Sequence, residues 1–72
     1  MTTQTQVPVQ LNGELRDLPA GLTVGQLLLH LDLNPRLVVV EHNGDILRRD
    51  TYDTASVAAG DTLELVHFVG GG

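Results

Sequence analysis

The last residues of the sequence are those whose types and spacing most clearly suggest chemistry. The chain ends Phe68-Val69-Gly70-Gly71-Gly72, directly after a stretch from 61 to 67 that is typical of a β-strand. Glycine has no Cβ, so a Gly-Gly-Gly tail can pass through a channel too narrow for side chains. Three extended residues span about 10 Å. We therefore expect the tail to present the Gly72 carboxylate to the active site of another protein. A frayed end or a cloning remnant is the alternative interpretation.

The other polar residues form no recognisable catalytic pattern. The three histidines, His30, His42 and His67, fall on separate predicted elements, and the sequence contains no cysteine. Asp50 and Asp53 lie in a polar loop, where carboxylates commonly form turns. The sequence has neither a P-loop nor a Gly-rich dinucleotide turn. We therefore expect no catalytic residue, no metal site, no stably bound cofactor and no ATP binding by this chain itself.

Composition restricts the class of partner. The sequence has 72 residues and a formal net charge of −5, with four arginines and no lysine. One small domain of this length fits the chain. An acidic domain is unsuited to nucleic acid, and it favours a partner with a basic docking face. There is no apolar run that could cross a membrane, and the absence of cysteine fits a reducing cytoplasm. We expect a cytoplasmic protein that is monomeric when free.

The first half of the sequence predicts a hairpin followed by a helix. Alternating apolar residues indicate strands at 7–11 and 14–18, joined by the turn-forming pair Asn12-Gly13. Because Pro8 lacks an amide hydrogen, we expect regular pairing only from about Val9. Thr23 and Gln26 form a predicted capping box. The apolar spacing that follows predicts a helix over 24–31, which ends before Asn34-Pro35.

The second half predicts three more strands. Residues 37–41 are expected to form a central strand that is buried on both faces. Asn43-Gly44 then turns into a short strand at 45–48, and residues 50–59 read as a loop with a short helical turn. The last strand spans 62–68, with Leu63 and Leu65 in the core and His67 at its margin. One helix covers one face of the sheet, so Val66 and Phe68 are expected on the open face.

This order of elements and turns resembles the ubiquitin-like β-grasp fold. At residue level the sequence resembles the ThiS-type sulfur carrier proteins of thiamin (thiazole) biosynthesis. The resemblance rests on segments that occur in a specific joint order and end at the glycine tail: 9–13, 22–28, 38–44, 49–52, and 60–72 without a gap.

The resemblance implies an α+β fold, with a mixed sheet of about five strands on one main helix. It divides the chain into a disordered N-terminal extension (1–6), a β-grasp domain (7–69) and a flexible glycine tail (70–72). It implies that a ThiF-like enzyme uses MgATP to adenylate the Gly72 carboxylate, which becomes a thiocarboxylate. A ThiG-like thiazole synthase then receives the sulfur. Gly70 and Gly71 would supply clearance, and Val66, Phe68 and Val69 would form the docking patch beside the tail.

Several alternatives share the same tail chemistry. The small subunit of molybdopterin synthase is a sulfur carrier of the same fold, but its family usually approaches the tail through a proline, which His67-Phe68-Val69 lacks. A carrier for cysteine or siderophore synthesis and a ubiquitin-like protein modifier are further possibilities. A plain interaction module with an inert tail is another. An adduct on other proteins would indicate the modifier.

Overall fold

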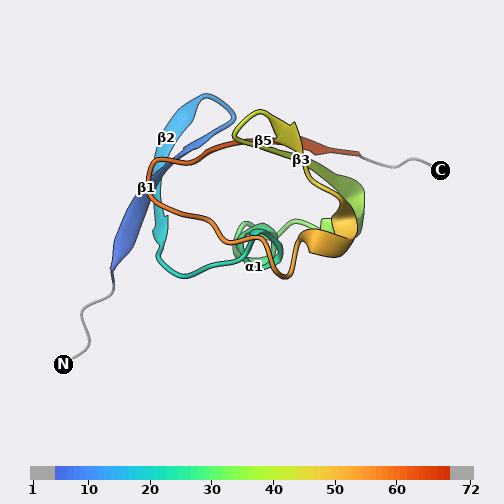
Figure 1. The fold of residues 1–72 in the computed structure, drawn as a ribbon, viewed down its shortest axis with the longest axis horizontal. Helices are drawn as coiled ribbons and strands as arrows, with labels where there is room; N and C mark the ends of the chain where they lie inside the picture. Colours follow the sequence, from blue (N-terminus) through green and yellow to red (C-terminus); the bar gives the residue numbers. More distant parts are fainter. Residues whose placement is uncertain (1–4, 69–72) are drawn as a thin grey trace.

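A computed structural model describes residues 5–68 of the chain. These residues form a five-stranded mixed sheet with one α-helix on one of its faces (Figure 1). The spatial strand order is β2-β1-β5-β3-β4, in which only β1 and β5 run parallel. The elements are β1 (Gln6–Leu11), β2 (Glu14–Pro19), α1 (Val24–His30), β3 (Val38–His42), β4 (Asp45–Ile46) and β5 (Thr62–His67). The predicted α+β β-grasp architecture is confirmed.

The first hairpin forms at the predicted turn but pairs over a longer stretch. Asn12 and Gly13 both adopt positive φ, 50° and 82°, as such tight turns require. Pairing with β2 begins at Gln6, so the expectation that it begins near Val9 is wrong. The Pro8 carbonyl accepts from the Gly60 amide at 2.8 Å. The N–H and C=O of one strand residue point to the same side, so the missing Pro8 donor faces away from β2.

The N-terminal boundary of the domain therefore lies earlier than predicted. The sequence predicts Gln6 in a disordered extension, but it is the first residue of β1. The carbonyl of Thr5 also accepts from the Ala20 amide at 3.0 Å, just beyond the end of β2. Residues 1–4 of the predicted extension, and Val69 with the glycine tail, lie outside the residues that the structure describes.

Helix α1 begins where the sequence predicts. The Gln26 amide donates to the Thr23 hydroxyl at 3.2 Å, and the Thr23 amide donates to the Gln26 side-chain oxygen at 2.9 Å. This reciprocal pair satisfies two amides that a helix start leaves without intrahelical partners. The helix ends at His30, one residue before the predicted end, because Asp32 takes a left-handed conformation with φ at 63°.

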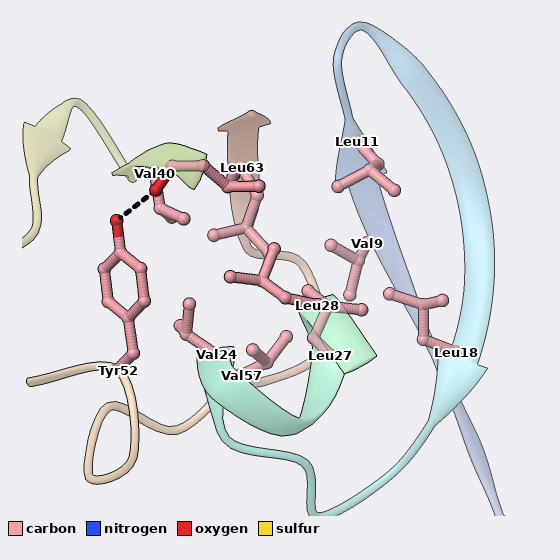
Figure 2. Close-up of a cluster of buried hydrophobic side chains, with 11 residues drawn as sticks. Val9, Leu11, Leu18, Val24, Leu27, Leu28, Val40, Tyr52, Val57 and Leu63 are labelled. Carbon is pink, nitrogen blue, oxygen red and sulfur yellow. Dashed lines mark hydrogen bonds between the residues drawn. The ribbon is translucent and has the colours of Figure 1, made fainter. Parts of the chain in front are cut away.

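The core lies between α1 and one face of the sheet (Figure 2). The helix contributes Val24, Leu27 and Leu28, which face the strands as the apolar spacing predicts. Two residues of the irregular segment before β5 close the core, and neither was predicted to be buried. They are Tyr52, whose hydroxyl donates to the Val38 carbonyl at 2.8 Å, and Val57. The remaining buried side chains come from the strands: Val9, Leu11, Leu18, Val38, Val40 and Leu63.

Strand β3 differs from its prediction in position and burial. It lies between β5 and the short β4, so β5 is the central strand. Val38 and Val40 are buried, but Val39 is only half-buried because α1 covers a single face of the sheet. The strand begins at Val38, after a 3₁₀-helix at Pro35–Leu37 that Asn34 caps through its side-chain oxygen.

Strands β4 and β5 are both shorter than predicted. β4 ends at Ile46, since the chain turns into a second 3₁₀-helix at Arg49–Thr51. β5 ends at His67, although the Phe68 amide still donates to the Leu37 carbonyl at 2.8 Å.

Two leucines of α1, Leu27 and Leu29, provide a matched test of this packing. Leu27 is fully buried, whereas Leu29 is 65% exposed. Leu27→Ala should lower the free energy of unfolding by about 2–5 kcal/mol, since it leaves a cavity in the core. Leu29→Ala should change it by less than about 0.5 kcal/mol. Urea unfolding followed by circular dichroism measures both, and equal losses would contradict the packing of α1 described here.

Candidate functional site

Strand β5 leads directly toward the glycine tail, and both Asn-Gly turns hold it. Asn12, in the turn between β1 and β2, accepts from the Leu65 amide at 2.7 Å through its side-chain oxygen. Asn43, in the turn between β3 and β4, accepts from the Thr62 amide at 2.8 Å. Each asparagine therefore makes a tight turn and also extends the hydrogen bonding of the central strand. The sequence showed the turns but gave no sign of these contacts, which join residues far apart in the chain.

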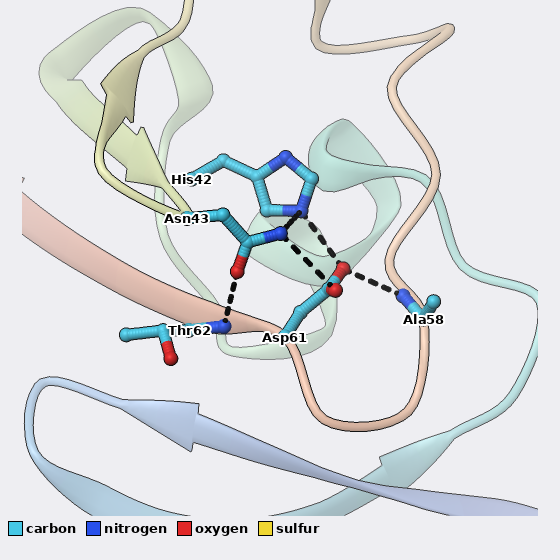
Figure 3. A network of polar contacts seen from close by, with 5 residues as sticks. All are labelled: His42, Asn43, Ala58, Asp61 and Thr62. Carbon is cyan, nitrogen blue, oxygen red and sulfur yellow. Dashed lines mark hydrogen bonds and ion pairs between the residues drawn. The ribbon is translucent and has the colours of Figure 1, made fainter.

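A polar network fixes the residue just before β5 (Figure 3). One Asp61 carboxylate oxygen lies 2.8 Å from the His42 Nε2 atom and accepts from the Ala58 amide at 2.8 Å. The other oxygen accepts from the Asn43 side-chain amide at 3.2 Å. The Asp61 and His42 side chains are only 14% and 20% exposed. This network ties the turn before β5 to the turn after β3.

The same contacts determine how Asp61 ionises. Partial burial raises the pKa of its carboxyl group. The hydrogen bonds with the Ala58 amide, His42 and Asn43 lower this pKa, and their combined effect is larger than that of burial. The net result is a pKa below the ordinary value of 3.8. No local sequence pattern indicates this contact, since Asp61 and His42 are 19 positions apart.

Toward the tail, β5 keeps a single neighbour. Its pairing with β1 covers Thr62 and Leu63, and Asn12 extends it to Leu65. Beyond that point the described part of β5 pairs only with β3, where Val66 lies opposite Val39. This end of the strand is consequently more open than its beginning.

The structure places Val66 and Phe68, two predicted docking residues, at this open end. Val66 is 56% exposed and Phe68 is 53% exposed. Val66 lies on the face of the sheet opposite α1, whereas Leu63 is buried and Leu65 half-buried on the core face. His67 was predicted at the margin of the core but is exposed, because the core ends before this part of the strand. Val69, Gly70, Gly71 and Gly72 lie outside the described residues.

The described residues offer no candidate metal site and no pocket. Residues 5–68 contain no group of three or more His, Cys, Asp or Glu side chains placed to hold a metal ion. His30 is exposed at the end of α1, and His42 is engaged with Asp61. No pocket forms on this part of the chain. None of its helices has the length and apolar character needed to cross a membrane.

Known proteins match the chain over almost its full length. A sequence model of the ThiS family matches residues 9–72. The sulfur carrier protein ThiS of Bacillus subtilis is 38% identical over 50 residues, which cover 69% of this chain and 76% of that protein. A crystal structure of the thiamine biosynthesis protein ThiS from Geobacter metallireducens superposes with a TM-score of 0.77 at 34% identity, covering 92% of this chain and all of that one.

A longer relative also contains a segment similar to this chain. A thiazole synthase from Magnetococcus marinus is 41% identical over 64 residues, which are 89% of this chain and 20% of that protein. The chain thus spans about a fifth of the length of the thiazole synthases that it matches.

The Asp61 network predicts a specific dependence of stability on pH. A carboxyl group whose pKa is lower in the folded than in the unfolded state stabilises the fold above the unfolded pKa, and this contribution disappears as pH falls through the folded pKa. Asp61→Asn should therefore destabilise the domain at pH 7, and its difference from the unaltered chain should shrink as pH falls below about 3.8. Urea unfolding across this range measures the difference.

Asp17→Asn is the matched control, since Asp17 is exposed on β2. At pH 7 it should change the free energy of unfolding by less than about 0.5 kcal/mol. A loss in Asp61→Asn that stays constant down to pH 2 would contradict the role given to the ionised carboxylate.

Proposed function

The chain belongs to the ThiS family, and we propose that it is a sulfur carrier whose C-terminal glycine delivers sulfur for the thiamin thiazole ring. The observation that carries this proposal is the match to the family model, which extends through Gly72 and so includes the whole glycine tail. The identity to the sulfur carrier of Bacillus subtilis and the likeness to the ThiS crystal structure support it further.

The proposed chemistry explains why an activating partner is needed. A carboxylate is a poor electrophile, so one oxygen must first become part of a leaving group. The Gly72 carboxylate attacks the α-phosphorus of ATP, pyrophosphate leaves, and an acyl-adenylate forms. Hydrosulfide (HS⁻) then attacks the acyl carbon, AMP leaves with the bonding electron pair, and the loss of the sulfur-bound proton gives a thiocarboxylate. A ThiF-like enzyme would hold the MgATP and supply the sulfur, so this chain would act as its substrate and not as a catalyst.

The arrangement of β5 supports this role. Asn12, Asn43 and the Asp61 network hold the first part of the strand. Val66 and Phe68 are exposed at the end from which the chain continues to Gly70, Gly71 and Gly72. An enzyme that docks on Val66, Phe68 and Val69 would receive the tail from a fixed starting point. Fixing the point from which a binding segment starts reduces the conformational entropy lost on binding.

The second proposed partner is a ThiG-like thiazole synthase, which would take the sulfur from the thiocarboxylate. Thiazole synthases that contain a segment similar to this chain support the pairing, because the two functions would then reside in one polypeptide. The proposal requires no stably bound cofactor on this chain.

Intact-protein mass spectrometry tests the proposal. The chain is incubated with the adenylating enzyme of its own organism, MgATP and a sulfur source. Its mass should increase by the difference between one sulfur and one oxygen atom. A variant that lacks Gly72 should keep its original mass, since its last carboxylate would sit one residue too far from the reacting phosphate.

The unaltered mass of the full chain, with an enzyme shown to form adenylate from ATP, would contradict the proposal. Covalent adducts between the chain and other proteins, without a sulfur-containing form, would instead indicate a protein modifier.

A further inference from the structure

The open face of the sheet carries two carboxylates that lie directly opposite each other. Glu41 on β3 and Glu64 on β5 are partners in the antiparallel register. Side chains of such partners project to the same face, with their Cβ atoms about 4.5–5.5 Å apart. Within residues 5–68, neither carboxylate forms an ion pair or a side-chain hydrogen bond. We call Glu41 and Glu64 the acidic pair.

No residue of the five strands compensates the acidic pair from this face. The register places twelve strand residues on the face away from α1, and none of them is basic. They are Gln6, Pro8, Gln10, Leu15, Asp17, Pro19, Val39, Glu41, Ile46, Thr62, Glu64 and Val66. Like charges directly opposite each other destabilise a sheet. The repulsion within the acidic pair therefore destabilises the isolated domain, and a basic side chain from a partner would relieve it.

The acidic pair is also continuous with the exposed apolar residues near the tail. Val39 and Val66 form the next pair along β3 and β5, and Phe68 follows, with its amide bonded to the Leu37 carbonyl. On the other side of Glu41, Ile46 is 71% exposed. The face thus combines an apolar part beside the tail with a negative part set between apolar side chains. Apolar flanks reduce the access of water to an ion pair formed there and strengthen it.

We infer that the acidic pair is a docking site for an arginine or lysine side chain of thiazole synthase, which binds while the tail enters its active site. This inference rests on the proposed function. Charge complementarity specifies a basic contact, since two adjacent carboxylates can accept the several donors of a guanidinium or ammonium group. The longer relatives specify the occupant: in a thiazole synthase that contains a segment like this chain, the rest of that polypeptide is held close to the segment.

Affinity for thiazole synthase from the same organism tests the inference. Binding of the unmodified chain is measured by isothermal titration calorimetry at low and at high salt. The double variant Glu41→Gln/Glu64→Gln should bind at least about tenfold more weakly at low salt. Its affinity should also depend less on salt than that of the unaltered chain, because the screened charges are gone.

The matched control removes two negative charges from a different place. Glu14→Gln/Asp17→Asn changes the net charge equally, but both residues are exposed on edge strand β2. Its affinity should stay within about twofold of the unaltered chain. Thermal unfolding adds a second readout: the Glu41→Gln/Glu64→Gln variant should be at least as stable as the unaltered chain, so weaker binding cannot come from misfolding.

Several results would overturn the inference. They are equal affinity of the unaltered chain and the Glu41→Gln/Glu64→Gln variant, an equal loss in the control, and no binding by the unaltered chain. Unchanged binding together with impaired thiocarboxylate formation would assign the pair to the adenylating enzyme instead. The affinity measurement needs no sulfur on the chain, so failure of the proposed function appears separately, as an unaltered mass in the sulfur-loading reaction.

Discussion

The structure depends on the hydrogen bonds that hold β5 in the centre of the sheet. This strand is the last to be reached along the chain, yet it lies between β1 and β3. Its parallel pairing with β1 requires a crossover, and the chain between them supplies α1 and the irregular segment that carries Tyr52 and Val57 (Figure 1). Asn12 and Asn43 add a side-chain contact from each side. The core, through Leu63, and the position of the last described residue, Phe68, both depend on this one strand.

Because the single helix α1 covers only one face of the sheet, the two faces have different roles. The face toward α1 holds the buried apolar side chains and stabilises the domain. The other face keeps exposed apolar residues and the acidic pair of Glu41 and Glu64, which contribute little to the stability of the isolated chain. In the proposed function the reactive group is the Gly72 carboxylate, so the folded domain would supply recognition and position for the enzymes that act on it.

Local sequence signals predicted much of this fold. The Asn-Gly turns, the capping box of Thr23 and Gln26, the apolar face of α1 and the alternation that exposes Val66 each depend on residues close together in the chain. The misses involve contacts between distant segments. Tyr52 is buried because its hydroxyl reaches the Val38 carbonyl, and no periodicity in residues 50–59 indicates this.

Gly25 is a second miss of this kind. Its amide donates to the Tyr52 carbonyl at 2.8 Å, and a Cβ at this position would lie 2.7 Å from an Asp53 carboxylate oxygen. The glycine thus leaves room for the close approach of two segments, and no local sequence pattern indicates this contact. For the candidate site, the sequence predicted the exposure of Val66 and Phe68 but not the asparagine contacts or the Asp61 network that hold β5. The role of the tail rests on the sequence and its relatives, since Val69–Gly72 lie outside the described residues.

An isotope followed through the transfer step tests most directly whether this chain carries sulfur on Gly72 for thiazole formation. The chain is loaded with ³⁴S at its terminus and incubated with thiazole synthase and the remaining thiazole precursors. The thiazole product should contain ³⁴S in proportion to the labelled chain consumed. Product without the label, or label that stays on the chain while product forms, would contradict it.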